Sequence, residues 1–476
     1  MSDKLPTSDS FHIPSELMEF VKRDTYSLLI KGNAGTGKTT LALTLLRALN
    51  IREGFQYIST RISPSQLYLY YPWLEQFFGA RKKSQLPDLI ENDVDADSLS
   101  FIDARLDEPV SLFERLTNQL MDNKSPMIIV DSWDTIGYFM DKEALMNNAR
   151  VLQTWRERAK AKMILISEDL SAPTFDFIAD GIIDLRQRHH NDRLLREIFI
   201  SKLRGVRINR PSYVYTLDHS IFHSYEPYNP SEFAISPDSK PMQMSSTSNL
   251  LKGSFIKSGN ADLDRVIGGG FPLNGIVNVV LDSNVNEKTI LAFLSQFISS
   301  FLSYGNSVLY QRSDQTNPEY VSNYLKACLQ ITKKQLDKLF FLVDLQRKTA
   351  PGKRAEKTHL SLYDATKTIK KKNPGKMLLS VISTESLGQY GDANDEGKGI
   401  DLLNLLKSIS DLTIVVSHGH KSDISHYISR NSDVSMRFLE INGTLFMQSE
   451  IPWSHLCALM VDRSHGYPRI LFDPVV

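Results

Sequence analysis

Residues 26–49 read YSLLIKGNAGTGKTTLALTLLRAL, and this stretch constrains the fold more than any other part of the chain. An apolar run is followed by a glycine-rich turn and then by a segment whose apolar residues recur at helical spacing. The turn matches the pattern G-x-x-x-x-G-K-[ST] in its required setting between a strand and a helix. The sequence therefore predicts a phosphate-binding P-loop, with an ordinary strand-to-helix turn as the alternative.

The residues of this loop predict how a nucleotide would be held. Its glycines allow backbone angles that bring consecutive N–H groups onto phosphate oxygens. Lys38 supplies a cation for the β- and γ-phosphates and is the first catalytic candidate, while Thr39 supplies a hydroxyl to the Mg²⁺ that bridges them. We therefore expect ATP and Mg²⁺ as cofactors. The expected nucleotide-binding residues are Gly32, Asn33, Ala34, Gly35, Thr36, Gly37, Lys38, Thr39 and Thr40.

Composition is that of a globular protein with two or three domains. Of the 476 residues, 41% are hydrophobic, and the 55 basic and 55 acidic residues balance, so no overall field attracts nucleic acid or anionic lipid. Apolar runs such as 275–281 are far too short to span a bilayer, and the first ten residues lack a signal core. We expect a cytoplasmic protein without a membrane partner. Cys328 and Cys457 indicate neither a disulfide framework nor a metal site.

Strand-like and helix-like segments alternate in the first half, which predicts an α/β fold with a mainly parallel sheet covered by helices. Ser63 followed by Pro64 predicts the start of a helix. Residues 85–98, rich in aspartate, are interpreted as a surface loop. The expected parallel strands are 26–31, 55–60, 99–102, 127–131, 163–167 and 181–185, and an antiparallel pair, 195–203 and 212–217, extends one edge.

A second part of the site is the segment 127–131, MIIVD, an apolar strand that ends in an acid. Asp131 would hold the Mg²⁺ opposite Thr39. Asp134 is a poorer candidate, because its position is more typical of a helix cap. The next strand ends in Ser167 and Glu168, where a polar group either senses the γ-phosphate or simply belongs to a loop.

These motifs, together with SKLRG at 201–205, resemble the KaiC-like branch of the RecA-type P-loop ATPases. In that family a Lys-x-Arg-Gly stretch on a late strand sends two basic side chains toward the γ-phosphate bound by the neighbouring subunit. The resemblance implies catalytic roles for Lys202 and Arg204, in a homo-oligomer or an intramolecular domain pair in which one unit completes the site of the next. The alternative is an exposed charged strand.

One position departs from this family. Its members carry a carboxylate just after the second strand to position the attacking water, whereas this chain reads YISTRISP at 57–64, with Arg61 and Ile62 at the matching positions. Neither accepts a proton, so we expect weak hydrolysis unless Asp134, Glu168 or a carboxylate from elsewhere substitutes. The Ser-Thr-Arg pattern also resembles the GvpD-like group of gas-vesicle regulators, which are P-loop proteins of the same wider group.

The second half is predicted to repeat the first. Residues 224–249, rich in Pro, Ser, Asn and Met, predict a linker between an ATP-binding domain at 11–223 and a second domain at 250–476. The second domain opens with SGNADLDRVIGGGFPLNGIVNVVL, which is similar to the entry pattern of KaiC-like domains. An offset of 250 residues aligns Lys288 with Lys38. We therefore expect two RecA-like P-loop NTPase domains.

The phosphate-binding chemistry is not retained in the second copy. The segment LDSNVNEKTI at 281–290 keeps Lys288 and Thr289 but none of the glycines, and Asp282 and Glu287 stand beside the phosphate position. The matching strand, MLLSVIST, has no metal-holding aspartate. We expect a pseudo-ATPase domain kept for assembly or partner binding.

Two further positions in the second half bear on this interpretation. The tail LMVDRSHGYPRILF offers no clear equivalent of Lys202 and Arg204. Asp314 falls near the carboxylate position that the first half lost, but without a nucleotide cradle it has no evident task.

Three functions remain open. A regulatory switch binds ATP tightly, hydrolyses it slowly and docks a partner protein. A DNA-dependent RecA/RadA-like recombination or repair ATPase would use the basic segments 185–210, 367–376 and 81–83, although no interleaved aromatic residues mark a stacking platform. A purely structural pseudo-ATPase would bind no nucleotide. Arg61 at the lost carboxylate position favours the first function.

Overall fold

The structure is a computed structural model. It describes residues 11–78, 101–108, 111–112, 114, 118, 127–134, 142–168, 176–177, 179–233, 250–311, 318–329, 332–343, 354–388, 397–418, 423–463 and 468–476. The chain divides into two compact units, Met1–Glu226 with Val475–Val476 and Pro227–Pro474. The last two residues thus group with the first unit, whereas the sequence division placed them in the second. Most of the expected linker lies outside the described residues.

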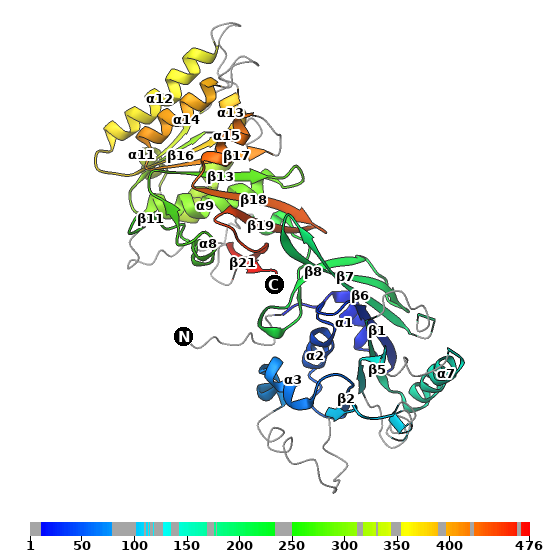
Figure 1. Ribbon diagram of the computed structural model, residues 1–476. Coiled ribbons are helices and arrows are strands. Elements are labelled where there is room, and N and C mark those ends of the chain that lie inside the picture. Colours follow the sequence, from blue (N-terminus) through cyan, green and yellow to red (C-terminus); the bar gives the residue numbers. More distant parts are fainter. Residues whose placement is uncertain are drawn as a thin grey trace. The chain divides into compact units, whose positions relative to one another are not determined.

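The first unit is built on a mixed sheet whose described strands follow the order β3-β2-β4-β5-β1-β6-β7-β8-β9 (Figure 1). Neighbours from β3 to β6 pair in parallel, and those from β6 to β9 pair antiparallel. The parallel sheet with an antiparallel edge is therefore confirmed. The strands are β1 Tyr26–Gly32, β2 Phe55–Ser59, β3 Phe101–Asp103, β4 Met127–Asp131, β5 Lys162–Ser167, β6 Gly181–His190, β7 Arg193–Leu203, β8 Ser212–Thr216 and β9 His223–Ser224.

Helices of the first unit start where the local sequence predicts. Pro64 opens a helix behind a capping box, in which the Ser63 hydroxyl accepts a hydrogen bond from Gln66 N at 3.3 Å. The predicted helix start is therefore confirmed, whereas the predicted loop at 85–98 lies outside the described residues. The described helices are α1 Ser15–Val21, α2 Lys38–Ala48, α3 Pro64–Tyr70, α4 Trp73–Phe78 and α7 Lys142–Ala159.

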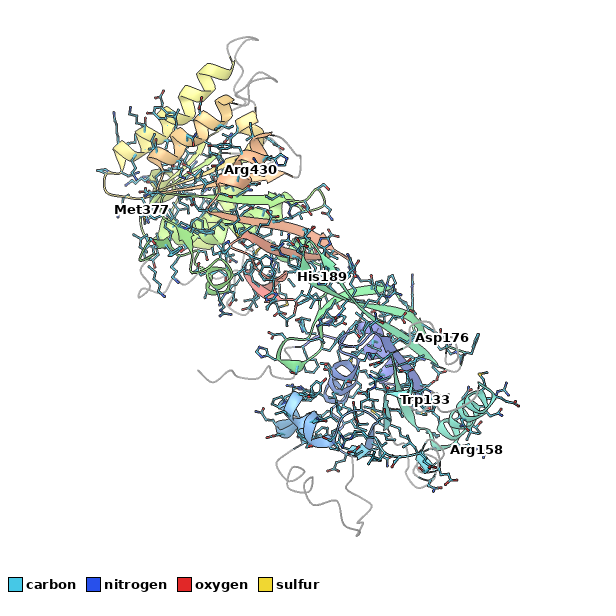
Figure 2. All side chains as sticks on the ribbon, viewed as in Figure 1. Trp133, Arg158, Asp176, His189, Met377 and Arg430 are labelled. Carbon is cyan, nitrogen blue, oxygen red and sulfur yellow. The ribbon has the colours of Figure 1, made fainter. Side chains whose placement is uncertain are left out.

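Both faces of the first sheet are covered by apolar side chains. Successive residues of β4 alternate between two clusters, since Ile129 packs in a cluster with Leu45 of α2. Ile128 and Val130 pack in the other cluster with Trp133, which is labelled in Figure 2. A run of consecutive apolar residues is what such a doubly covered parallel strand requires.

The second unit repeats this strand order, β15-β14-β16-β17-β13-β18-β19-β20-β21 among its described strands (Figure 1). A small sheet of β10 Leu251–Lys252, β11 Phe255–Ile256 and β12 Phe271–Pro272 stands beside it. The strands are β13 Gly275–Leu281, β14 Ser307–Gln311, β15 Phe340–Val343, β16 Leu378–Ser383, β17 Leu412–His418, β18 Val434–Ile441, β19 Thr444–Ile451, β20 Cys457–Asp462 and β21 Arg469–Pro474. Two mainly parallel sheets covered by helices are thus present, as predicted.

The helices of the second unit complete the covering layers. They are α8 Ala261–Val266, α9 Glu287–Ser303, α10 Pro318–Leu329, α11 Lys333–Leu339, α12 Arg354–Lys372, α13 Thr384–Gly388, α14 Gly397–Ile409 and α15 Asp423–Asn431. Within the described ranges, none of the helices in either unit has both the length and the apolar character needed to cross a membrane.

The shared strand order corrects one sequence alignment. Strand β19 takes the place of β7, and the tail strands β20 and β21 take the places of β8 and β9. The tail was therefore the wrong segment to compare with Lys202 and Arg204. By strand register Ile451, at the end of β19, takes the place of Lys202, and Trp453 follows it by two residues as Arg204 follows Lys202, so neither position supplies a cation.

Leu45→Ala should destabilise the first unit. Leu45 is fully buried in α2, so its truncation should lower the free energy of unfolding by about 2–5 kcal/mol through lost burial and a cavity. The matched control is Leu69→Ala on α3, whose side chain is 73% exposed, and it should change stability by less than about 0.5 kcal/mol. Urea unfolding followed by tryptophan fluorescence measures both, and equal effects would contradict the core assignment.

His223 should make the first unit less stable in acid. Burial lowers the pKa of His223 to about 4, and its Nδ1 accepts a hydrogen bond from His12 N at 2.9 Å. The His223 ring takes up a proton near pH 6.5 in the unfolded chain but only near pH 4 in the folded protein. The free energy of unfolding should therefore fall by up to about 3 kcal/mol as the pH is lowered from 6.5 to 4. Urea unfolding at stepped pH should show a shallower fall in His223→Asn but not in His219→Asn, which alters an exposed ring. An unchanged profile in His223→Asn would contradict this role.

Candidate phosphate-binding site

Three parallel strands end together at one edge of the first sheet. Strand β5 lies between β1 and β4, and Lys31 pairs with Ser167 while Val130 pairs with Leu165. The carboxyl ends of β1, β4 and β5 therefore meet, which is the usual location of ligand sites in open α/β sheets. The glycine-rich loop leaves β1 at this edge and runs directly into α2 (Figure 1).

Two positions show why the loop requires glycine and support from β8. Gly37 has φ 88°, and a Cβ atom there would lie 2.6 Å from Leu217 Cδ1. Thr36 is fixed from both sides, because its hydroxyl donates to Asn33 O at 2.8 Å and its carbonyl accepts from the Tyr215 hydroxyl. The crest of the loop, residues 33–35, is exposed to solvent. The base of the loop is thus fixed by hydrogen bonds at Thr36, while residues 33–35 are exposed to solvent.

Lys38 spans the inside of this loop. Its ammonium group donates to Gly32 O at 2.7 Å and to Asn33 O at 2.9 Å, and the side chain is only 6% exposed. Burial lowers the pKa of Lys38, while the nearby carboxylate of Glu168, 3.9 Å from the ammonium, acts in the opposite direction. A cation is therefore held at the loop, and its role in binding phosphate stays a prediction.

Thr39 and Asp131 are brought together from positions far apart in the sequence. The Thr39 hydroxyl donates to Asp131 Oδ2 at 2.6 Å, and the Tyr57 hydroxyl donates to the same oxygen. Burial, followed by the charge of Asp131, raises the pKa of Tyr57 well above its usual value, so the phenol stays a donor. A hydroxyl and a carboxylate side by side form an oxygen donor set that suits Mg²⁺. The next residue, Thr40, is buried and shares a hydrogen bond with Tyr71.

The polar residues that follow β4 and β5 interlock. Asp134 accepts hydrogen bonds from the Ser167 hydroxyl at 2.7 Å and from the backbone N–H of Glu168. Asp134 therefore positions the end of β5. The Glu168 side chain contacts Arg61 Nη1 as well as lying near Lys38. Of the two candidate carboxylates, Glu168 lies 3.9 Å from the Lys38 ammonium group.

Lys202 and Arg204 lie back from the loop of their own unit along the strands, with Lys202 level with Leu29 of β1. Lys202 pairs with Ile182 near the start of β6, whereas the loop follows Gly32, which pairs with Leu185. The Lys202 ammonium donates to Asp176 O at 2.8 Å, and Arg204 donates to Asp180 at 3.2 Å. Burial lowers the pKa of Lys202. Their action on a neighbouring unit's phosphate stays a prediction.

Several residues at this edge were not singled out from the sequence. Arg196 of β7 donates to Gly35 O at 2.8 Å, and Tyr57 and Tyr215 donate as described above. Arg196 also donates to Val476 O at 2.9 Å within the same unit. The sequence counted Arg196 only within a basic stretch, and the missing signal was the antiparallel pairing that carries β7 back past the loop.

At two described positions of the second unit, the residues differ from those of the first site. By strand register, Leu281 takes the place of Gly32 and Ser383 takes the place of Asp131. The Asp282 carboxylate, at the start of the loop's counterpart, accepts from Arg437 Nη1 at 3.1 Å, and Arg437 Nε donates to Glu450 at 3.0 Å. The side chain of Lys288 and the whole of Asp314 lie outside the described residues.

Comparison with known proteins gives three kinds of similarity. Residues 17–201 match the family profile of the P-loop domain of the GvpD gas vesicle protein. The chain is 24% identical over 339 residues to Protein GvpD2 and 25% identical over 327 residues to Protein GvpD1, both from Halobacterium salinarum. It is 23% identical over 297 residues to the circadian clock oscillator protein KaiC of Prochlorococcus marinus.

These matches cover part of each protein. They include 67%, 66% and 57% of this chain for GvpD2, GvpD1 and KaiC respectively. The corresponding shares of the relatives are 65%, 59% and 52%, so the chain spans less than two thirds of the length of each.

Tyr57→Phe should raise the Mg²⁺ concentration needed for nucleotide binding by about tenfold, because the hydroxyl that orients Asp131 is lost. The matched control is Tyr26→Phe, which removes a buried hydroxyl that has no hydrogen-bond partner in the described part of the chain. Titration of Mg²⁺ at a fixed concentration of a fluorescent ATP analogue measures the requirement. An unchanged requirement in Tyr57→Phe would contradict a role for this hydroxyl.

Proposed function

We propose that this chain, whose residues 17–201 match the GvpD P-loop domain and which is similar to GvpD and KaiC, is an ATP-dependent regulatory or assembly switch with weak hydrolysis. The observation that carries this proposal is the meeting of Lys38, Thr39 and Asp131 at one sheet edge, with Arg61 at the position where a catalytic carboxylate is expected.

The residues of the first unit suit a nucleotide triphosphate. Lys38 supplies a cation at the loop, and the loop backbone and the start of α2 supply N–H donors. Thr39 and Asp131 would hold Mg²⁺, which neutralises charge on the bridged phosphates when it is bound. Tyr57 orients Asp131 by a hydrogen bond to its carboxylate. Asp134 orients the end of β5 by accepting a hydrogen bond from the Ser167 hydroxyl.

Weak hydrolysis follows from the way the carboxylates at this edge are engaged. Asp131 accepts from Thr39 and from Tyr57, and Asp134 accepts from the end of β5. Arg61 stands at the position where a carboxylate would position the attacking water, and a guanidinium group does not accept a proton. Binding of ATP and its conversion to ADP would then be well separated in time, as a switch requires.

The second unit is proposed to serve assembly rather than catalysis. It keeps the strand order of the first unit but has Leu281 and Ser383 at the loop and metal positions. Because of this loss, we propose that it acts in a homo-oligomer, in domain pairing or in docking a partner protein. The proposed division of the chain is an ATP-binding domain at 11–223, a linker at 224–249 and this second domain at 250–476. Lys202 and Arg204 would complete a neighbouring site in such an assembly. We place the protein in the cytoplasm.

The alternative DNA-dependent recombination or repair ATPase is not favoured by the basic segment of β6 and β7. Arg188 is paired with Glu197 at 2.6 Å, and Arg186 stacks over Phe199 with a 4.6 Å separation from the ring centroid. Arg196 and Arg204 are bonded to Gly35 and Asp180 as described above. These cations are already engaged within the unit, so DNA would have to displace existing contacts.

Lys38→Ala should weaken MgATP binding at least about a hundredfold, because the loop loses its cation. The control Lys22→Ala removes an exposed lysine after α1 and should leave binding unchanged. Calorimetric titration measures affinity, and phosphate release measures turnover with and without single-stranded DNA. We expect slow turnover that DNA does not alter.

Two results would count against this function. A many-fold rise in turnover with DNA would favour the recombination or repair ATPase. Equal affinity of the wild type and Lys38→Ala would remove the proposed nucleotide site.

A further inference from the structure

We propose that Arg61 and Glu168 form a γ-phosphate sensor, in which the Glu168 carboxylate competes with the γ-phosphate for Lys38 and Arg61. When ATP binds, Arg61 exchanges Glu168 for the γ-phosphate. This inference rests on the proposed function, because it needs the first unit to bind MgATP. It goes further by assigning to two side chains the distinction between ATP and ADP.

Glu168 lies close to both Lys38 and Arg61. Glu168 directly follows β5, the strand between the loop strand β1 and the metal-site strand β4. Its Oε1 atom lies 3.9 Å from Lys38 Nζ and contacts Arg61 Nη1. Its backbone N–H donates a hydrogen bond to Asp134, which fixes the backbone from which the side chain extends. A carboxylate is thereby presented to the cation that serves phosphate in a P-loop.

Both cations suit a phosphate group as a partner. Lys38 and Arg61 approach one oxygen of the Glu168 carboxylate from two different strands, β1 through its loop and β2 through the segment after Ser59. The γ-phosphate carries more charge and more acceptor oxygens than a carboxylate. The planar guanidinium of Arg61 suits phosphate as well as it suits carboxylate, so both cations have reason to prefer the phosphate.

Exposure makes this exchange feasible. The side chain of Arg61 is 45% exposed and that of Glu168 is 31% exposed, whereas Lys38 is 6% exposed. Arg61 and Glu168 therefore separate without leaving a buried charge unpaired, and an ion pair with this exposure is weak. Lys38 stays in place through its two hydrogen bonds to the backbone carbonyl oxygens of the loop. The movable partners are the glutamate and the arginine, and the fixed point is the lysine.

The exchange would also reach α3. Arg61 precedes the capping residue Ser63 by two positions, and the intervening Ile62 N donates to the Ser59 hydroxyl at 3.2 Å. A change in the partner of Arg61 thus acts on the short segment that sets the start of α3. ADP, which lacks the γ-phosphate, would leave Arg61 on Glu168.

The test compares the affinity of the full chain for a non-hydrolysable ATP analogue and for ADP, each with Mg²⁺, by calorimetry. Arg61→Ala should weaken binding of the ATP analogue about tenfold and binding of ADP less than about twofold, because a charge-assisted bond to the γ-phosphate is lost. Arg61→Lys should fall between Arg61→Ala and wild type. Glu168→Gln should tighten the ATP analogue about three- to tenfold relative to ADP, because a competing charge is removed.

Matched controls remove exposed groups from other ion pairs. Arg188→Ala breaks the pair with Glu197, and Glu157→Gln alters the exposed partner of Arg156. Both should leave the ATP-to-ADP preference unchanged. Circular dichroism of each variant confirms that the fold is kept, and Arg61→Lys provides the comparison if Arg61→Ala does not fold.

The outcomes separate the inference from the proposed function. If the wild type binds nucleotide and Arg61→Ala keeps its ATP-to-ADP preference, the sensor is wrong and the nucleotide site stands. If Glu168→Gln weakens the ATP analogue selectively, Glu168 supports the γ-phosphate and the proposed competition is wrong. If the wild type binds neither nucleotide, the proposed function fails and the sensor with it.

Discussion

The buried ammonium group of Lys38, bonded to the carbonyl oxygens of Gly32 and Asn33, is the interaction on which the first unit's site depends. A buried charge is tolerated only when it is hydrogen-bonded or paired, so the loop's shape and its cation require each other. The same cation draws Glu168 toward the loop. The glycines, the bracing by Tyr215 and the carboxylates at the sheet edge are all arranged about this fixed positive charge.

The second unit shows that the architecture does not depend on that charge. It has the same strand order and a large apolar core of its own, yet Leu281 and Ser383 stand at the glycine and aspartate positions. Fold and site are therefore separable, since the cores stabilise the sheets and a few edge residues supply the chemistry. The two sheets share one strand order, while the residues at the glycine and aspartate positions differ.

The sequence predicted the parts of the structure that are encoded locally. The loop, the acid at the end of β4 and the helix start at Ser63 are each specified by a few neighbouring residues. The pairs Tyr57 with Asp131 and Arg61 with Glu168 join positions 74 and 107 residues apart, and only the strand order brings them together. The tail was compared with the wrong strand for the same reason, because local patterns do not say which strands are counterparts.

If the first unit holds a triphosphate and the second does not, each chain should bind a single nucleotide. The most direct measurement is the number of nucleotides bound per chain, determined by equilibrium dialysis with a radiolabelled non-hydrolysable ATP analogue and Mg²⁺. We expect saturation at one nucleotide per chain. Saturation at two, or no binding at all, would contradict it.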